Sequence, residues 1–512
     1  MKKKRQIKIN GGKYSFYSGE TFRDILLRND LGMIFPCGGG GICGKCRVKI
    51  ISGKQKITIQ DKEKIDKAEL KQGWRLACKM VPQSGVEVYI PHENTIGNRK
   101  VRFSGSRRDG KTVGFAVIDA GSSTVKAVLA DGAGNAGPVS SVSNPQIKIS
   151  TDIIGRIGFA MESANNYTAL RNLLIEGINN VLKEALISSG KISSGIRRGF
   201  IAGNSFITAL LKEESLKGLS AIPFNCENRK SKKIKSSDFF RLASVSVLPV
   251  IGGFVGADAL AECIYLRRYY KNKNVILIDI GTNAEIIVYY GGKYFAASAS
   301  AGPAFEGLGM SCGFPMLEGA VRDIRSKPAD DKPLSRESQF DFVVSSVGNL
   351  KPAGICGTGY LSAVAEFLKN GLIDRTGRIA GGKDRIEITD NISVNQQDIR
   401  MFQNAKAAIG AGISLILKKI KADYGDFAEI LVSGAFGSNV SVDDFYVTGI
   451  ISPEFRKVKA VDNLVLKGML EVVAEGVSMS KLESFAAKVQ RIKLAEDKDF
   501  MEYYTGAMSF EK

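Results

Sequence analysis

The sequence predicts a multidomain protein in which a small α+β domain precedes a larger α/β core. Three observations support this class. Four cysteines stand among short strand and helix patterns near the N-terminus, a basic stretch without apolar periodicity follows, and beyond it short apolar strands alternate with helical segments. At 512 residues the chain is long enough for about two to four domains. We predict domains at residues 1–91 and 112–512, joined by a basic flexible linker at 92–111.

The N-terminal domain is predicted from its order of elements. Apolar and polar residues alternate over 3–10, and Gly11-Gly12 is typical of a hairpin turn into a second strand that ends at Tyr17. Residues 21–28 have the apolar spacing of a helix. After the cysteine loop, the patterns predict a strand, a short helix and a last strand, at 47–52, 61–70 and 86–90. This is the order of elements in a small β-grasp ferredoxin.

The cysteines of this domain have the spacing C-x5-C-x2-C-x31-C and are Cys37, Cys43, Cys46 and Cys78. The glycines between the first two permit the positive φ angles and the close N–H···S approach that a loop around an iron–sulfur cluster requires. A zinc site usually pairs two short C-x2-C knuckles, and Cys78 has no such neighbour. The spacing therefore predicts a 2Fe–2S cluster of the plant or adrenodoxin type, bound by these four thiolates.

The core is predicted to be duplicated, with halves at 112–270 and 271–512. Asp119 and Asp279 each end an apolar strand that runs into a turn of small residues. Backbone N–H groups of such turns bind phosphate, and a neighbouring carboxylate can hold Mg²⁺ through water. A third glycine-containing turn, after another apolar strand, has room for adenine and ribose. The candidate nucleotide-binding residues are Gly121, Ser122, Ser123, Thr124, Gly281, Thr282, Asn283, Gly434, Phe436, Gly437 and Asn439.

Together the three turns resemble the pattern of acetate kinases, sugar kinases, Hsp70 and actin, and the sequence has neither a P-loop nor a Rossmann GxGxxG. The resemblance implies ATP and Mg²⁺ as ligands of an actin-like (ASKHA) ATPase core. Asp119 and Asp279 are our candidates for positioning magnesium-bound water and phosphate. Asp258 is a third catalytic candidate, because some related kinases keep a base at the corresponding place. A helix N-cap is an equally open interpretation of Asp258.

Further segments extend a resemblance over nearly the whole chain; they lie at 144–146, 152–157, 203–205, 255–258, 301–313, 354–359 and 495–500. With the cysteine loop, they are similar to the ferredoxin-fused reductive activators of corrinoid proteins. The family implies ATP-dependent transfer of one electron from the cluster to Co(II) cobalamin on a corrinoid protein, which regenerates Co(I) for methyl transfer. It also implies an external low-potential electron donor and a homodimer. Relatives usually carry threonines where Ser122 and Ser123 stand here.

Composition restricts the other possibilities. The net charge is +20, but the basic residues are spread along the chain without a nucleic-acid-binding motif, so we expect solvated loops or an acidic protein partner and no nucleic acid. No run of eighteen apolar residues predicts a membrane helix, and no apolar segment follows the charged N-terminus as in a signal peptide. We therefore expect a cytoplasmic protein that does not bind a membrane.

Two other functions remain open. A metabolite kinase of the same fold would leave the cluster domain without a role. A nucleotide-regulated electron carrier or redox sensor would use both domains without activating a client. Binding of cobalamin by the chain itself is disfavoured, because His92 is the only histidine and no D-x-H-x-x-G motif is present.

Overall fold

The computed structural model describes residues 4–29, 31, 33, 35, 39, 41, 44, 46–91, 114–191, 196–307, 309–316, 318–328, 340–434, 436, 440–455 and 457–510. The chain separates into two compact units: Met1–Arg99 with Ser143–Glu176, and Lys100–Val142 with Gly177–Lys512. The predicted linker at 92–111 lies outside the described residues. The grouping of 143–176 with the N-terminal domain was not predicted from the sequence.

The N-terminal domain is a five-stranded mixed sheet in the order β2-β1-β5-β3-β4, with three short helices. Its elements are β1 Lys4–Ile9, β2 Gly12–Tyr17, α1 Phe22–Arg28, β3 Arg47–Ser52, α2 Ile59–Lys64, α3 Lys67–Lys71, β4 Trp74–Leu76 and β5 Glu87–Tyr89. Asn10 and Gly11 have φ angles of +46° and +82°, as a two-residue hairpin requires between twisted strands. The parallel pairing of β1 with β5 completes the predicted β-grasp sheet.

Two details of this domain differ from the prediction. The single helix expected near 61–70 is two helices, because Asp66 accepts a hydrogen bond from the N–H of Glu69 at 2.8 Å and caps the start of α3. A short strand, β4, precedes Cys78 and pairs with β3. The first unit also contains α4 Ile153–Glu162 and part of α5 Ala164–Ser188.

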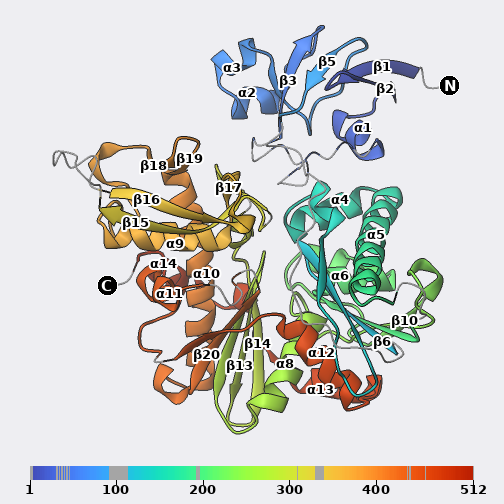
Figure 1. Ribbon diagram of the computed structural model, residues 1–512, viewed down its shortest axis with the longest axis vertical. Helices are drawn as coiled ribbons and strands as arrows, with labels where there is room; N and C mark the ends of the chain where they lie inside the picture. The colour runs from blue at the N-terminus through green and yellow to red at the C-terminus, as the bar shows by residue number, and fades with distance from the viewer. Residues whose placement is uncertain are drawn as a thin grey trace. The chain divides into compact units, whose positions relative to one another are not determined.

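The core contains two six-stranded sheets of corresponding topology (Figure 1). The first has the order β10-β11-β9-β6-β7-β8, with strands β6 Phe115–Ala120, β7 Thr124–Ala130, β8 Ser140–Ser143, β9 Arg198–Gly203, β10 Lys232–Ile234 and β11 Val245–Val247. The second has the order β21-β20-β12-β13-β14-β22, with strands β12 Val275–Ile280, β13 Ala284–Tyr290, β14 Lys293–Ala299, β20 Glu429–Gly434, β21 Val458–Ala460 and β22 Gln490–Arg491. In each sheet, three strands that follow one another in the chain lie side by side, and a parallel strand flanks the first of them: β9 beside β6, and β20 beside β12. The two sheets therefore share one strand arrangement, which confirms the predicted duplication.

The helices of the core are α6 Ser205–Lys212, α7 Lys217–Ser220, α8 Ala257–Tyr269, α9 Gly357–Lys369, α10 Gln396–Ile420, α11 Val442–Thr448, α12 Leu464–Ala474, α13 Met479–Lys488 and α14 Phe500–Gly506. Smaller sheets are formed by β15 Ala320–Pro328, β16 Phe340–Ser346 and β17 Gly354–Ile355, and by β18 Arg385–Thr389 and β19 Ile392–Asn395. None of the helices in the described part of the chain is long and apolar enough to span a membrane.

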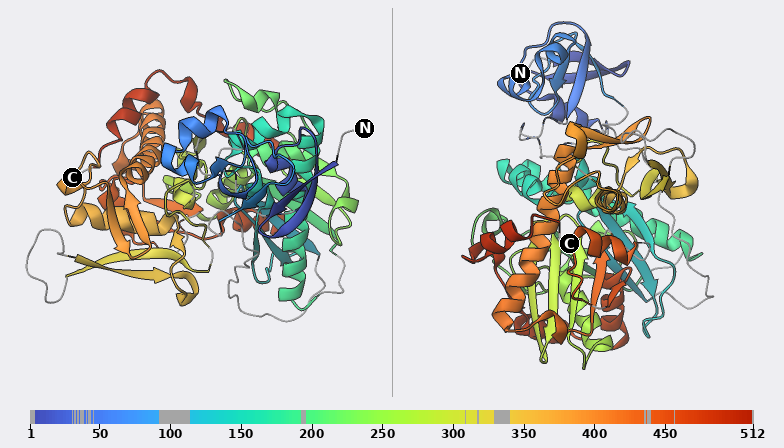
Figure 2. Two further views of the ribbon diagram at one scale, coloured as in Figure 1. Left: turned by 90° about the horizontal axis from the view of Figure 1, so that it is seen from above. Right: turned by 90° about the vertical axis from the view of Figure 1, so that its left-hand side faces the viewer.

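The second sheet separates two apolar cores, because side chains of a strand alternate between its faces. Ile276 and Ile278 of β12 belong to the core on the side of α10, which runs along β13 and β14 (Figure 2). Val275 and Leu277 of the same strand belong to the other core, where α8 packs against α12. Strand β12 is therefore buried on both faces, and its polar residue Asp279 near the C-terminal end requires a functional explanation.

Candidate nucleotide site and cluster ligands

The two predicted phosphate turns are tight turns between antiparallel strands. In the first, the N–H of Gly121 donates to the carbonyl of Thr124 at 3.1 Å. In the second, the N–H of Gly281 donates to the carbonyl of Asn283 at 2.9 Å. The innermost paired residues are Ala120 with Val125 in the first turn and Ile280 with Ala284 in the second, so the first turn is one residue longer. The hydroxyl of Ser123 is buried and has no hydrogen-bond partner among the described residues. A hydroxyl of this kind fits a role in donating a hydrogen bond to a phosphate oxygen of a bound ligand.

The third turn lies directly against the second. Strand β20 pairs in parallel with β12, so that Gly434 stands beside Ile280 in the register. Gly434 has a φ angle of +84°, and a Cβ at this position would overlap the Asp279 carboxylate and the Ile280 carbonyl. Only glycine therefore permits this close approach. Gly437 and Asn439, also predicted to bind the nucleotide, lie outside the described residues.

Phe436 has a different role from the one expected. Its side chain is only 1% exposed. Its ring packs edge-on against Phe305 and Phe445, with centroid distances of 5.2 and 5.5 Å. The ring therefore belongs to the apolar core, and only the backbone of Phe436 is available to a ligand at the third turn.

The first turn is tied to the start of two helices. The amide of Asn204 donates to the hydroxyl of Ser122 at 3.0 Å, and its carbonyl oxygen caps α6 by accepting from the N–H of Ile207. A Cβ on Gly256 would overlap the backbone of Asn204, so α8 begins in close contact with the end of β9. Gly256 is the N-cap of α8, and Asp258 is its second helical residue. The alternative interpretation of Asp258 as the N-cap is therefore wrong.

The three predicted carboxylates influence one another electrostatically. Burial raises the pKa of Asp119 to about 6, against the attraction of Lys126, and repulsion from Asp279 adds to the increase. Burial raises the pKa of Asp258 to about 7, against the N–H of Ala259, and repulsion from Asp279 and Asp119 adds to it. Burial also raises the pKa of Asp279, against the attraction of Lys126.

Two further carboxylates of the group were not predicted. Glu262 follows Asp258 by one helical turn and is fully buried; burial, then repulsion from Asp279, raises its pKa well above the ordinary value. Glu285 stands opposite Asp279 in the β12–β13 register, and burial, then repulsion from Asp258, raises its pKa too. Two features of the sequence could have indicated these residues. Glu262 follows Asp258 at i, i+4 on one helix, and Glu285 lies across a turn from Asp279.

This carboxylate group suits a bound cation. Several acidic side chains share a buried region in which Lys126 is the cation that lowers the pKa values of Asp119 and Asp279. Buried carboxylates are stabilised when positive charge is added nearby. Among the described residues, no three acidic, histidine or cysteine side chains are close enough to hold a metal ion directly. A magnesium ion that keeps its water and binds chiefly to phosphate fits this arrangement.

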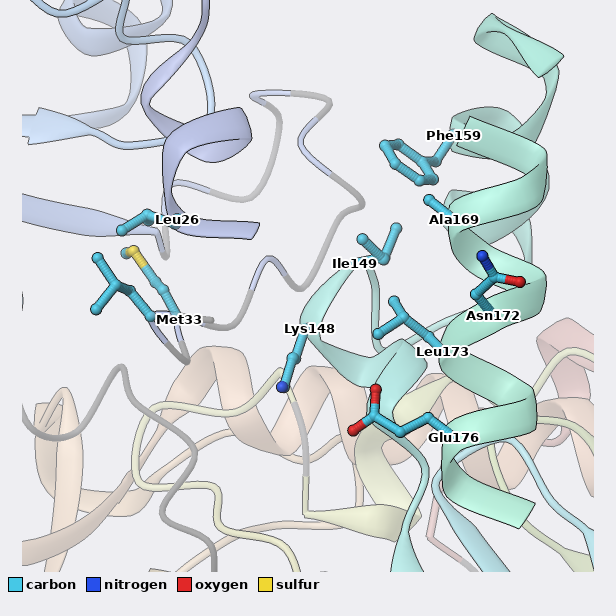
Figure 3. A pocket seen from close by; sticks show the side chains of 10 residues that line it. Leu26, Met33, Lys148, Ile149, Phe159, Ala169, Asn172, Leu173 and Glu176 are labelled. Atoms are coloured by element: carbon cyan, nitrogen blue, oxygen red, sulfur yellow. The ribbon is translucent and has the colours of Figure 1, made fainter. Parts of the chain in front are cut away.

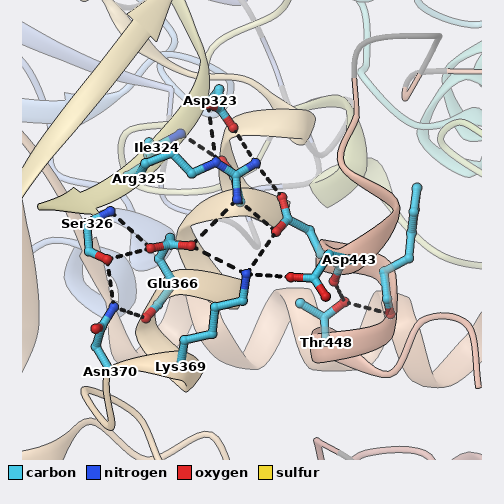
Figure 4. Close-up of polar contacts among 12 residues, drawn as sticks. Asp323, Ile324, Arg325, Ser326, Glu366, Lys369, Asn370, Asp443 and Thr448 are labelled. Atoms are coloured by element: carbon cyan, nitrogen blue, oxygen red, sulfur yellow. Dashed lines mark hydrogen bonds and ion pairs between the residues drawn. The ribbon is translucent and has the colours of Figure 1, made fainter. Parts of the chain in front are cut away.

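An ion-pair network joins α11 to its neighbours (Figure 4). The guanidinium of Arg325 on β15 makes two hydrogen bonds of 2.9 and 2.8 Å to the carboxylate of Asp444, whose side chain is 1% exposed. Lys369 on α9 binds Asp443 at 2.7 Å. Helix α11, which begins shortly after the third turn, is thereby tied to two other elements.

The cluster domain brings together two of the four predicted cysteine ligands. The N–H of Ala77 donates to the carbonyl of Cys46 at 2.8 Å, so Cys46, directly before β3, lies beside the segment that carries Cys78 after β4. Both cysteines are buried. Cys37 and Cys43 lie outside the described residues. Gly39 and Gly41, within the loop, have φ angles of +86° and +79°, as the glycine-rich pattern predicts.

The first unit also contains a pocket of about 400 Å³ (Figure 3). Its lining is mostly apolar: Leu26, Leu31, Met33, Ile149, Phe159, Ala169 and Leu173, with Lys148, Asn172 and Glu176. Among its described lining residues, none is a predicted phosphate-binding or cluster-binding residue.

Several segments that suggested the family have structural roles. Asp152 caps α4 by accepting from the N–H of Gly155 at 2.7 Å. Arg156 is fully buried and donates to the carbonyl of Ser150 and to the side chain of Gln146, at 2.9 and 3.2 Å. These residues form a buried polar cluster that orders the start of α4.

Three family descriptions match the chain and together cover most of it. They are "2Fe-2S iron-sulfur cluster binding domain" at residues 7–83, "RACo middle region" at 113–269, and "C-terminal domain of RACo the ASKHA domain" at 273–512. The chain therefore carries an iron–sulfur-binding domain followed by a nucleotide-binding core. The matched middle region occupies the residues that we assign to the first half of the core.

Known proteins are similar over long stretches. A corrinoid activation enzyme RamQ of Eubacterium limosum is 28% identical over 449 residues, which are 81% of this chain and 73% of the relative. A Co(II) methylated amine-specific corrinoid protein reductase of Methanosarcina barkeri is 28% identical over 279 residues, 52% of this chain and 51% of the relative. The solved structure of a reductive activator for corrinoid,iron-sulfur protein has a TM-score of 0.68 at 20% identity, over 99% of this chain and 98% of that one. This last likeness shows the fold.

Proposed function

Since the chain belongs to the RACo family of ferredoxin-fused reductive activators, we propose that it reactivates a corrinoid protein in an ATP-dependent reaction. One electron passes from the 2Fe–2S domain to inactive Co(II) cobalamin on the client and gives Co(I), which is competent for methyl transfer. The observation that carries the proposal is the presence, in one chain, of adjacent cluster cysteines and a carboxylate-lined pair of phosphate turns.

In this proposal, Asp119 and Asp279 position the water shell of Mg²⁺, and the backbone of the two turns binds the phosphates of ATP. Magnesium-bound ATP supplies the positive charge and the phosphate acceptors that the buried carboxylates and the Ser123 hydroxyl lack. Asp258, with a pKa raised to about 7, orients or deprotonates a water molecule. Cys37, Cys43, Cys46 and Cys78 bind the cluster, which stores one electron.

A nucleotide is useful here because the electron transfer is uphill. Plant-type clusters have potentials near −400 mV, and the family's cobalt couple lies lower still. For one electron, 59 mV corresponds to about 1.4 kcal/mol. A gap of roughly 100 to 200 mV is therefore a few kcal/mol, which differential binding of ATP to two conformations can supply.

The proposal also covers the domain boundaries, the electron donor, the client, the oligomeric state and the cellular location. Residues 1–91 form the ferredoxin domain, 92–111 the linker, and 112–512 the ATPase core with halves at 112–270 and 271–512. An external low-potential donor reduces the cluster, the client is a corrinoid protein of a methyltransferase system, and the activator works as a homodimer in the cytoplasm.

The test is an anaerobic ATPase assay with and without a Co(II) corrinoid protein, in which Co(I) absorbance is followed. We expect ATP hydrolysis to be stimulated by the client and Co(I) to form only with ATP. Co(I) formation without nucleotide would contradict the role of ATP. ATP use that depends on a small hydroxyl or carboxyl acceptor would support a metabolite kinase, and nucleotide-independent electron transfer to another acceptor would support an electron carrier.

A further inference from the structure

The positive charge of the chain is concentrated in its N-terminal domain. Residues 1–91 contain 19 Lys and Arg against 8 Asp and Glu, so this domain carries +11 of the net +20 in less than a fifth of the length. The proposed cluster, bound by four thiolates, would add negative charge only at its own site. A small domain with this excess attracts acidic partners over a distance set by the Debye length, about 8 Å at physiological salt.

Part of this charge lies directly on the cluster loop. A Cβ on Gly41 would come within 2.8 Å of the Lys79 side chain and 3.1 Å of Gln60, and a Cβ on Gly44 within 3.3 Å of Lys64. Gln60 and Lys64 lie one turn apart on α2 and therefore share a face of the helix. The lysine stems thus cover Gly41 and Gly44 of the loop that bears the cluster ligands.

Apolar side chains are exposed on the two segments that carry these lysines, α2 and the residues after Cys78. Ile59, the first residue of α2, is 70% exposed, and Val81, three residues after Cys78, is 48% exposed. The segment before α2 is tied to the segment after Cys78, because the amide of Gln55 donates to the carbonyl of Val81 at 3.1 Å. We call the surface formed by Ile59, Gln60, Lys64, Lys79 and Val81 the cluster-loop face.

The charges of the cluster-loop face are available to a partner. Among the described residues, neither the Lys64 nor the Lys79 ammonium lies within 4 Å of a carboxylate. By contrast, Arg47, on the adjacent strand, is paired with Glu69 at 2.7 Å. A basic rim around exposed apolar side chains is the arrangement of a transient protein interface, in which charge speeds the encounter and apolar contact orients it.

We propose that the cluster-loop face docks an acidic electron-carrier protein that reduces the cluster. The inference rests on the proposed function, because only a cluster that turns over needs an external reductant. One electron leaves the carrier and enters the oxidised cluster, and no covalent bond forms or breaks. The corrinoid client has to be recognised by a protein that also binds ATP, whereas an electron donor needs to contact only the cluster domain. A charge excess concentrated in the cluster domain therefore fits the donor.

The experiment measures cluster reduction by stopped-flow absorbance in the full-length protein, without ATP and without a corrinoid protein. The probe is an acidic flavodoxin in its hydroquinone form. The variant is Lys64→Glu with Lys79→Glu. The matched control is Lys8→Glu with Lys13→Glu, which makes the same charge change on β1 and β2, at the opposite edge of the sheet from β4.

At low ionic strength we expect the second-order rate constant to fall at least tenfold in the cluster-loop variant and less than about threefold in the control. The difference between them should shrink at about 0.5 M salt, because exposed charges are screened. Equal slowing of both variants, or no slowing of either, would overturn the proposal. Normal reduction by flavodoxin in this assay, combined with slower Co(I) formation by the same variant in the separate client assay proposed above, would assign the face to the client instead and would also overturn the proposal.

Two measurements keep the outcome clear. The first is the cluster content of each variant, taken from the visible spectrum after reduction by excess dithionite. If the Glu variant contains little cluster, the second uses Lys64→Gln with Lys79→Gln instead, for which we expect the second-order rate constant to fall about threefold or more. Since the assay contains no client and no ATP, a protein that fails to activate any corrinoid protein can still confirm the docking face.

Discussion

At the scale of single residues, Asp258 gives the nucleotide-free protein a distinctive pH dependence. Burial raises its pKa from 3.8 to about 7. The folded state therefore binds the proton more tightly than the unfolded chain, so this contribution to stability is full below about pH 4 and is lost as the pH rises through 7. We predict that the melting temperature of the nucleotide-free protein falls between pH 5 and pH 8.

Thermal unfolding of Asp258→Asn tests this prediction. The neutral amide cannot ionise, so the variant should lose part of the pH slope and melt about 2–4 °C higher than the natural protein at pH 8. Asp390→Asn, which changes an exposed carboxylate in the β18–β19 turn, should leave the slope unchanged. An unchanged slope in Asp258→Asn would show that this carboxyl does not hold a proton in the folded protein.

A second prediction for a single residue concerns Gly434. Alanine there would adopt a positive φ angle, which costs roughly 1–2 kcal/mol, and its Cβ would displace the Asp279 carboxylate. We expect Gly434→Ala to weaken ATP binding at least tenfold, measured by isothermal titration calorimetry. Gly371→Ala is the control, because Gly371 also has a positive φ angle, +66°, but has no neighbouring atom within 4 Å of the added Cβ. Equal ATP affinity in the two variants would contradict the proposed close approach.

At the scale of elements, α11 depends on the Arg325 network. Arg325→Gln would leave the buried Asp444 carboxylate without its bidentate partner, and loss of one member of a buried pair is strongly destabilising. Because the pair is partly exposed on the arginine side, we expect a loss of about 1–3 kcal/mol and a several-fold weaker affinity for ATP.

Arg385→Gln is the matched control for this network. It removes an ion pair with Glu387 in which both side chains are more than half exposed. Such a pair contributes about 0–1 kcal/mol, so stability and ATP affinity should change little. If Arg325→Gln lowers the melting temperature without changing ATP affinity, the network supports the fold but not the nucleotide site.

The sequence predicted the elements and turns better than the side-chain environment of the site. Alternation and glycine positions were sufficient for the two turns after β6 and β12, since these are local properties of the chain. The contribution of Glu262 depends on where α8 packs, and the role of Phe436 depends on the aromatic cluster around it. Both are consequences of tertiary packing, which no local pattern in one sequence reveals.

At the scale of the whole molecule, the two chemical functions should be separable. The apolar core of the ferredoxin domain consists of residues between Ile7 and Ile90, and the cores of the ATPase are built from other residues. We predict that Cys78→Ser abolishes the visible absorbance of the cluster and Co(I) formation, while the affinity for ATP stays within about twofold of the natural protein.

Cys226→Ser is the control for this change. Its sulfur lies 3.3 Å from the carbonyl of Gly253, a hydrogen bond that serine preserves, and it is not a predicted cluster ligand. This variant should keep the cluster. Loss of ATP binding in Cys78→Ser would show that an empty cluster domain disturbs the core.

The contact between α8 and α12 bears on the order in which the newly made chain folds. Residues of α12, beyond position 463, complete the apolar core that α8 and parts of the first sheet share, and Glu483 of α13 accepts hydrogen bonds from Ser231. Contacts of such long sequence separation form late. During synthesis, the ferredoxin domain can therefore fold and receive its iron and sulfide while the ATPase halves still wait for the last fifty residues to leave the ribosome.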